Sequence, residues 1–161
     1  MTTRPDPVRD ADAEALALAR SLLAGADHAA LAVSDPADGL PGISRIAFGL
    51  DPDGVPVSLI SSLSAHHRAL VANPACALMV GEPGPKGDPL THPRLMVKAR
   101  AEFVARDAPD RAALRDHWLD GHPKAKLYVD FGDFGFVRFR PVSILLNGGF
   151  GKAFRIDPTQ I

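Results

Sequence analysis

Three serines stand at a predicted junction between a strand and a short helix. Ser61, Ser62 and Ser64 follow the apolar run 55–60 and precede a segment that ends at Asn73-Pro74. Ser64 is a favourable N-cap, because its hydroxyl can accept a hydrogen bond from an N–H group left free in the first helical turn. Free N–H groups and the positive end of the helix dipole attract anions. The pattern predicts a phosphate-binding turn, although serines at such junctions also serve as caps alone.

Basic side chains accompany this turn. His66, His67 and Arg68 follow Ser64 directly. Arg45 lies on the predicted strand 42–50, which precedes the strand that leads into the serines. On a partly apolar strand face it is either an edge residue that reaches solvent or a residue that binds a ligand. A guanidinium offers a planar fork of donors to phosphate, so the second interpretation places Arg45 and the serines in one anion site.

Other ligand-binding patterns are missing from the sequence. His66-His67 is not expected to bind a metal ion, because adjacent helical residues diverge and the pair lacks an i, i+4 spacing. The stretch Gly148-Gly149-Phe150-Gly151 connects two predicted strands, whereas a dinucleotide-binding glycine motif opens a helix. No P-loop, nucleophile elbow or zinc-ligand spacing occurs.

Composition restricts the class of protein. A chain of 161 residues is long enough for one domain with a proper core. A net charge of −1 argues against general nucleic-acid binding. No apolar run has the length of a membrane span, and 1–8 lacks the apolar segment of a signal peptide. Because Cys76 is the single cysteine, we expect no internal disulfide and a cytoplasmic location.

Hydrophobic periodicity predicts a mainly β protein with a few helices, in the α+β class. A first helix is expected from Asp6-Pro7 to Gly25, and a second to be capped by Asp107 and to bury Leu114 and Trp118. Short connections between the early strands predict an antiparallel split or closed barrel with helices packed outside. The expected strands, about six or seven in number, are 28–33, 42–50, 55–60, 75–81, 94–104, 134–146 and 150–156.

Four stretches of the chain carry a family resemblance: 43–46, 59–74, 88–95 and 122–151. Together they resemble the flavin-binding split-barrel proteins related to pyridoxamine 5′-phosphate oxidase and, within them, the heme-utilisation (HugZ-like) branch. The resemblance implies one split-barrel domain over 1–161, with an N-terminal helix in 1–26 and the barrel in 27–156. It also implies a homodimer that holds FMN (flavin mononucleotide) at the subunit interface.

The resemblance assigns candidate cofactor-binding residues. Arg45, with Ile46 in the same motif, falls where the family places a flavin-contacting arginine. Ser61 and Ser62 match a pair that touches the flavin phosphate. Ser64-Ala65-His66 falls where many members read Ser-Arg-Lys, so the chain lacks two expected cations. We therefore expect FMN to be bound more weakly here, or mainly by Arg45, the hydroxyls and the helix terminus.

Two departures concern the substrate. The strand 138–147 lacks the acidic, tryptophan and glutamine pattern of true pyridoxamine phosphate oxidases, so that substrate is not assigned. Heme-degrading members extend past the position of Ile161, and their heme ligand is expected in that extension. Heme therefore enters only as a ligand or substrate suggested by the family, and no histidine is nominated as its axial ligand.

Two functional hypotheses follow. In the first, the protein is an FMN-dependent oxidoreductase whose substrate is a heme, another tetrapyrrole or a small oxidised molecule. Flavin would supply the redox chemistry, which agrees with the lack of a protein nucleophile motif. In the second, the dimer is a non-catalytic flavin- or heme-binding module, or a regulatory one.

Overall fold

The computed structural model describes residues 4–161; residues 1–3, part of the segment searched for a signal peptide, lie outside this range. Three α-helices occur in it, α1 (Ala13–Gly25), α2 (Ala65–Ala72) and α3 (Arg111–Gly121), with short 3-10 turns η1 (Pro89–Thr91), η2 (Pro123–Leu127) and η3 (Pro158–Gln160). The nine strands of the range are β1 (Val8–Asp10), β2 (His28–Ser34), β3 (Pro41–Ala47), β4 (Gly49–Leu50), β5 (Pro56–Ser61), β6 (Ala75–Val80), β7 (Arg94–Phe103), β8 (Phe134–Asn147) and β9 (Ala153–Ile156).

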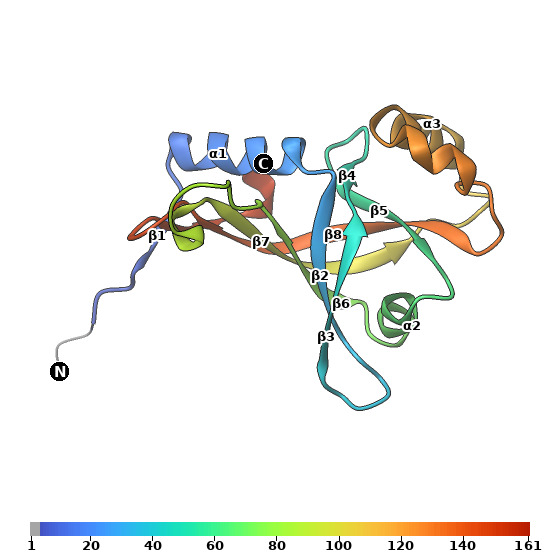
Figure 1. The fold of residues 1–161 in the computed structure, drawn as a ribbon, viewed down its shortest axis with the longest axis horizontal. Coiled ribbons are helices and arrows are strands. Elements are labelled where there is room, and N and C mark those ends of the chain that lie inside the picture. The colour runs from blue at the N-terminus through green and yellow to red at the C-terminus, as the bar shows by residue number, and fades with distance from the viewer. Residues whose placement is uncertain (1–3) are drawn as a thin grey trace.

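The long strand β8 organises the sheet. It pairs antiparallel with β7 along one edge, and on its other edge with β5 at one end and β9 at the other. From β7 the sheet continues through β6 and β2 to β3, while β4 pairs with β5. No backbone ladder pairs β3 with β5, which are joined through the 2.6 Å hydrogen bond from the Ser58 hydroxyl to the Ala47 carbonyl, so the barrel stays open (Figure 1). The predicted fold class, a mainly antiparallel split barrel with helices, is confirmed.

Successive side chains of each strand point to opposite faces of the sheet, and the buried ones form two separate clusters. One fills the barrel and includes Leu31, Leu78, Val97 and Phe139. The other lies outside the barrel, where α3 and η2 cover β5 and β8. Strand β5 contributes to both, because Val57 and Leu59 face α3 while Ile60 faces the barrel. Burial on both faces explains why 55–60 reads as a continuous apolar run.

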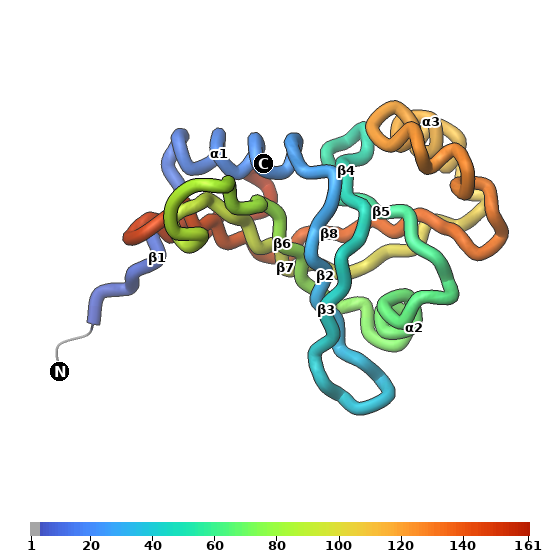
Figure 2. Tube along the Cα trace, in the orientation of Figure 1, coloured from blue at the N-terminus to red at the C-terminus, as the bar shows by residue number. Residues whose placement is uncertain are grey.

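The three helices pack around the sheet. In Figure 1, α1 lies along one side of the barrel and α3 at the other end, beside β5 and β8. The stripe Ala15, Ala19 and Leu23 of α1 is buried, as the helical spacing predicts. Figure 2 shows the C-terminus close to α1, where Arg20 donates a 2.5 Å hydrogen bond to the carbonyl of Gln160. No helix in residues 4–161 is long and apolar enough to cross a membrane.

Helix starts were the least accurate sequence predictions. The helix expected from Asp6-Pro7 begins at Ala13, with Asp12 as its N-cap, because 8–10 form strand β1. That strand pairs in parallel with β9, a contact between distant parts of the chain that local patterns do not reveal. Helix α3 begins after Asp110, three residues beyond the predicted cap at Asp107.

Two predicted strands were also too long. The expected strand 42–50 is interrupted at Phe48, and its halves β3 and β4 pair with different partners, β2 and β5. The strand expected from Phe150 starts at Ala153, because a tight turn precedes it: the N–H of Gly148 donates to the carbonyl of Lys152 over 2.7 Å.

Candidate functional site

The predicted serine turn exists and joins the end of β5 to the start of α2. Ser64 is the N-cap of α2, and its hydroxyl accepts a 3.2 Å hydrogen bond from the N–H of His67. The same hydroxyl donates to the carbonyl of Ser61 at 2.7 Å. Because its two hydrogen bonds are internal, Ser64 shapes the turn, which is the role that capping alone predicts.

Several donors of this turn remain available to a ligand. Within residues 4–161, the N–H groups of Ala65 and His66 make no hydrogen bond, as expected for the first turn of a helix. The exposed hydroxyl of Ser62 has no partner in the same range either. Donors of this kind at the positive end of a helix are suited to a phosphate oxygen.

The two histidines of the turn carry little positive charge at neutral pH. Burial lowers the pKa of His66, and the neighbouring His67 lowers it further. Burial also lowers the pKa of His67, whose ring packs edge-on against Phe103 with 5.0 Å between centroids. These two side chains therefore add little attraction for an anion, which leaves the backbone N–H groups at the helix start and the exposed Arg68 of α2.

Arg45 and Ile46 lie on β3 and face opposite sides of the sheet. Ile46 is buried in the barrel core, so only its backbone is available to a ligand. Arg45 is exposed on the outer face, opposite Ala30 of β2. Although α2 packs against β3, no hydrogen bond within residues 4–161 joins Arg45 to the serine turn.

An acidic residue beside the serine turn was missed by the sequence analysis. The carboxylate of Asp133 accepts a 2.6 Å hydrogen bond from the hydroxyl of Ser61, and its carbonyl accepts one of 2.7 Å from the N–H of Ser62. Asp133 belongs to the stretch 122–151 that carried the family resemblance, but its contact with Ser61 spans 72 positions. No local pattern could have revealed this contact.

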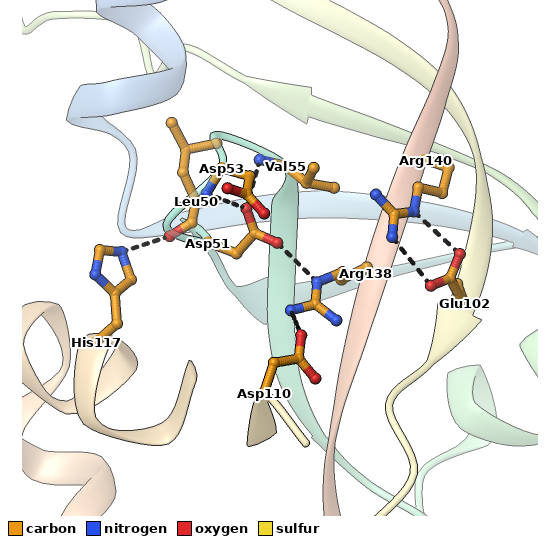
Figure 3. Close-up of polar contacts among 9 residues, drawn as sticks. All are labelled: Leu50, Asp51, Asp53, Val55, Glu102, Asp110, His117, Arg138 and Arg140. Carbon is orange, nitrogen blue, oxygen red and sulfur yellow. Dashed lines mark hydrogen bonds and ion pairs between the residues drawn. The ribbon is translucent and has the colours of Figure 1, made fainter. Parts of the chain in front are cut away.

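A buried ion network lies near the other end of β5, also without a sequence signal. Figure 3 shows Arg138 of β8 between Asp51 and Asp110, with hydrogen bonds of 2.7 Å to each. The second oxygen of Asp51 accepts the N–H groups of Asp53 and Val55, both at 2.9 Å. This network fixes the β4–β5 turn and the start of α3 to the barrel.

In the described part of the chain, no group of three or more His, Cys, Asp or Glu is placed to hold a metal ion. His117 instead bonds through Nε2 to the carbonyl of Leu50 at 2.9 Å, and the ring of His122 stacks on Trp118 at 3.8 Å.

The chain is similar to proteins from a plant and from bacteria. The chloroplastic non-canonical heme oxygenase HOZ of Arabidopsis thaliana is 37% identical over 117 residues, which cover 73% of this chain and 35% of that protein. The structure of Atu2129 from Agrobacterium tumefaciens is 32% identical with a TM-score of 0.77, over 97% of this chain and 65% of that one. A heme-binding protein from Mycobacterium smegmatis is 28% identical with a TM-score of 0.81, over 99% and 61%.

The chain thus spans about a third of the curated relative and less than two thirds of each of these two structures. Residues 16–147 match the family described as pyridoxamine 5′-phosphate oxidase. The match covers both β3 and the serine turn, together with the long strand β8. The chain belongs to the pyridoxamine 5′-phosphate oxidase family, in the branch of split barrels that includes heme-utilisation proteins.

Proposed function

We propose that the protein is an FMN-binding flavoprotein that acts as an oxidoreductase, and that the serine turn holds the flavin phosphate. The observation that carries this proposal is a set of donors at the start of α2, from Ser62, Ala65 and His66, that have no partner within residues 4–161, in a chain of this family. These three groups are hydrogen-bond donors, and the oxygens of a phosphate can accept hydrogen bonds from all of them.

The outer face of the sheet supports a dimer with the flavin at its interface. Arg45, Ala30, Met79 and Met96 lie in one cross-strand row over β3, β2, β6 and β7. Met79 is 49% exposed, and Ile43 in the adjacent row is 77% exposed. An apolar sheet face of this kind, left open by the helices, is typical of a surface that a partner covers. A second copy on this face would bury the row that contains Arg45.

Flavin would supply hydride or electron transfer, while the protein orients the cofactor and excludes water. In this proposal the chain needs no nucleophile of its own. Its Arg45 would neutralise negative charge on the cofactor, and the N–H groups of Ala65 and His66 would fix the phosphate. The heme descriptions of the Arabidopsis and Mycobacterium relatives make a heme or another tetrapyrrole the proposed substrate or ligand.

The test is an absorption spectrum of the purified protein, followed by fluorescence titrations with FMN and with riboflavin, which lacks the phosphate. We expect a flavin band or micromolar FMN binding, and weaker binding of riboflavin. Ser62→Ala should weaken FMN binding, whereas Ser143→Ala, which removes an exposed hydroxyl on β8, should not. Failure of FMN to bind at millimolar concentration would contradict the proposal.

A non-catalytic flavin- or heme-binding module is the second candidate. The lowered pKa of His66 and the carboxylate of Asp133 beside the turn both reduce the attraction for a phosphate dianion. Heme titration of the flavin-free protein, followed by optical spectroscopy, separates the candidates. Heme binding without flavin binding or turnover would favour the module.

A further inference from the structure

Asp133 holds the serine turn by two different groups. Its carboxylate accepts the hydroxyl proton of Ser61 at 2.6 Å, and its backbone carbonyl accepts the N–H of Ser62 at 2.7 Å. Ser61 ends β5, while Asp133 directly precedes β8, and the two strands pair at Ser61 and Phe134. The acid therefore connects the turn before α2 to the loop before β8.

This contact changes the role expected for Ser61. A serine hydroxyl can donate one hydrogen bond, and the Ser61 hydroxyl donates its hydrogen bond to the carboxylate of Asp133. The hydroxyl oxygen accepts the N–H of Leu63 at 3.2 Å, and the carbonyl of Ser61 accepts the N–H of Ser64 at 3.1 Å. Ser61 thus organises the turn and has no hydrogen left to donate to a phosphate.

The loop that carries Asp133 is itself held in place. Nη2 of Arg106 donates to the carbonyl oxygens of Phe131, Gly132 and Phe134, at 2.7, 2.7 and 2.8 Å. These three carbonyls flank Asp133 on both sides. The backbone that carries Asp133 is therefore held by contacts other than those with the serine turn.

We propose that Asp133 is a positioning residue for the phosphate turn, acting through Ser61, and that Ser61 is not itself a phosphate ligand. The inference rests on the proposed FMN function. The carboxylate holds the donors of Ser62, Ala65 and His66 in one arrangement, but its negative charge opposes a phosphate nearby. An uncharged acceptor at position 133 should keep the arrangement and remove the repulsion.

Asp133→Asn and Asp133→Ala separate these two effects, because the asparagine oxygen can still accept the Ser61 proton. We expect Asp133→Ala to weaken FMN binding about three- to tenfold, the range for one lost hydrogen bond. Asp133→Asn should bind FMN at least as tightly as the unmodified protein. Riboflavin affinity should change less than about twofold in either variant, since it has no phosphate.

Ser61→Ala tests the route through the serine. If Ser61 only transmits the effect of Asp133, Ser61→Ala should lose at least as much FMN affinity as Asp133→Ala, because it keeps the repelling charge, and the double variant should lose no more than Ser61→Ala. Additive losses would overturn the proposal, because they would make Ser61 an independent phosphate ligand. A loss with Asp133→Asn as large as that with Asp133→Ala would overturn it as well.

Asp130→Asn is the matched control. Asp130 lies on the same loop, but it pairs with Arg115 at 2.5 and 2.8 Å and does not contact the turn. It should leave the ratio of FMN to riboflavin affinity unchanged. An equal shift of this ratio in Asp130→Asn and Asp133→Asn would mean that only the net charge of the loop matters. It would contradict a specific role for Asp133.

Hydrogen–deuterium exchange of the ligand-free protein tests the positioning independently of flavin. The N–H groups of residues 62–64, which are hydrogen-bonded within the turn or to Asp133, should exchange faster in Asp133→Ala than in Asp133→Asn or Asp130→Asn, with unchanged thermal unfolding of the barrel. Equal exchange in all variants would overturn the inference even if FMN binds. If the unmodified protein binds no flavin, the proposed function fails, while faster exchange in Asp133→Ala still supports the positioning role.

Discussion

Arg138 donates from Nε to the Oδ2 atom of Asp51 across 2.7 Å, and the side chains are only 11% and 2% exposed. A second donor of the same guanidinium reaches Asp110, which precedes α3. Separating Arg138 from these acids would leave an unpaired charge in the protein interior, which is costly. The ion pairs therefore hold the β4–β5 turn and the start of α3 against the sheet.

Removing the acid from this pair should destabilise the protein strongly. Asp51→Ala leaves Arg138 without its buried partner and also removes the acceptor for the N–H groups of Asp53 and Val55. We expect the free energy of unfolding to fall by about 3 kcal/mol or more, measured by urea denaturation. Glu102→Ala, which breaks the exposed pair with Arg140, should cost less than about 1 kcal/mol. Similar losses in both variants would contradict the importance of burial.

A second prediction concerns pH. A hydrogen bond to Asp27, and a second one to Glu82, raise the pKa of His28 above its ordinary value. Because the folded-state pKa is the higher one, the stabilisation is complete below the unfolded-state pKa, about 6.5, and is lost as the pH rises through the folded-state value. The free energy of unfolding should therefore fall more between pH 6 and 8 in the unmodified protein than in His28→Gln.

The comparison with His28→Gln is needed because His66 and His67 act in the opposite direction. Burial lowers their pKa values, so they destabilise the folded state as the pH falls below the unfolded-state value. Both histidines are present in both proteins, and their contribution cancels in the difference. A difference that does not vary with pH would show that His28 is not stabilised by its two acids.

A fixed cation in the serine turn should strengthen the proposed phosphate binding. His66 is largely neutral near pH 7 because of its lowered pKa, and Ala65 carries no charge. We expect His66→Lys to increase FMN affinity several-fold at pH 8, with little change for riboflavin, in fluorescence titrations. An equal gain for riboflavin would mean that the lysine does not act on the phosphate.

Arg45 is the other proposed source of positive charge. It is exposed on the row of residues that would face a second subunit. We expect Arg45→Ala to weaken FMN binding by roughly 1.5–3 kcal/mol, the range for a charged hydrogen bond. Lys126→Ala, which removes an exposed cation on η2, serves as the control. Unchanged affinity in a titration of Arg45→Ala would remove this residue from the site.

The outer face of the sheet predicts the oligomeric state. Met79→Asp places a charge in the middle of the row shared with Ala30 and Met96, and it should convert a dimer to a monomer in light-scattering chromatography. FMN affinity should fall with it. Leu127→Asp alters another apolar side chain, 79% exposed on η2, and should leave the dimer intact. A monomer in the unmodified protein would exclude the proposed interface.

The sequence alone determined the features that depend on local pattern. The alternation in β7, the continuous apolar run in β5 and the cap at Ser64 follow from neighbouring residues, and they predicted these elements closely. The same local chemistry placed Ser61, Ser62, Ser64 and His66 in one turn. Family motifs were enough to identify the split barrel, because they occur in order across most of the chain.

Only the tertiary structure decided which distant residues meet. Strand β1 exists because β9 is beside it, and Phe48 interrupts a predicted strand whose halves have different partners. The carboxylate of Asp133 reaches Ser61 across 72 positions, and Arg138 reaches Asp51 across 87. Such contacts arise from strand pairing and shared burial, which act between segments far apart in the chain. They decide that the hydroxyl of Ser61 is engaged by Asp133, whereas the hydroxyl of Ser62 has no partner within residues 4–161.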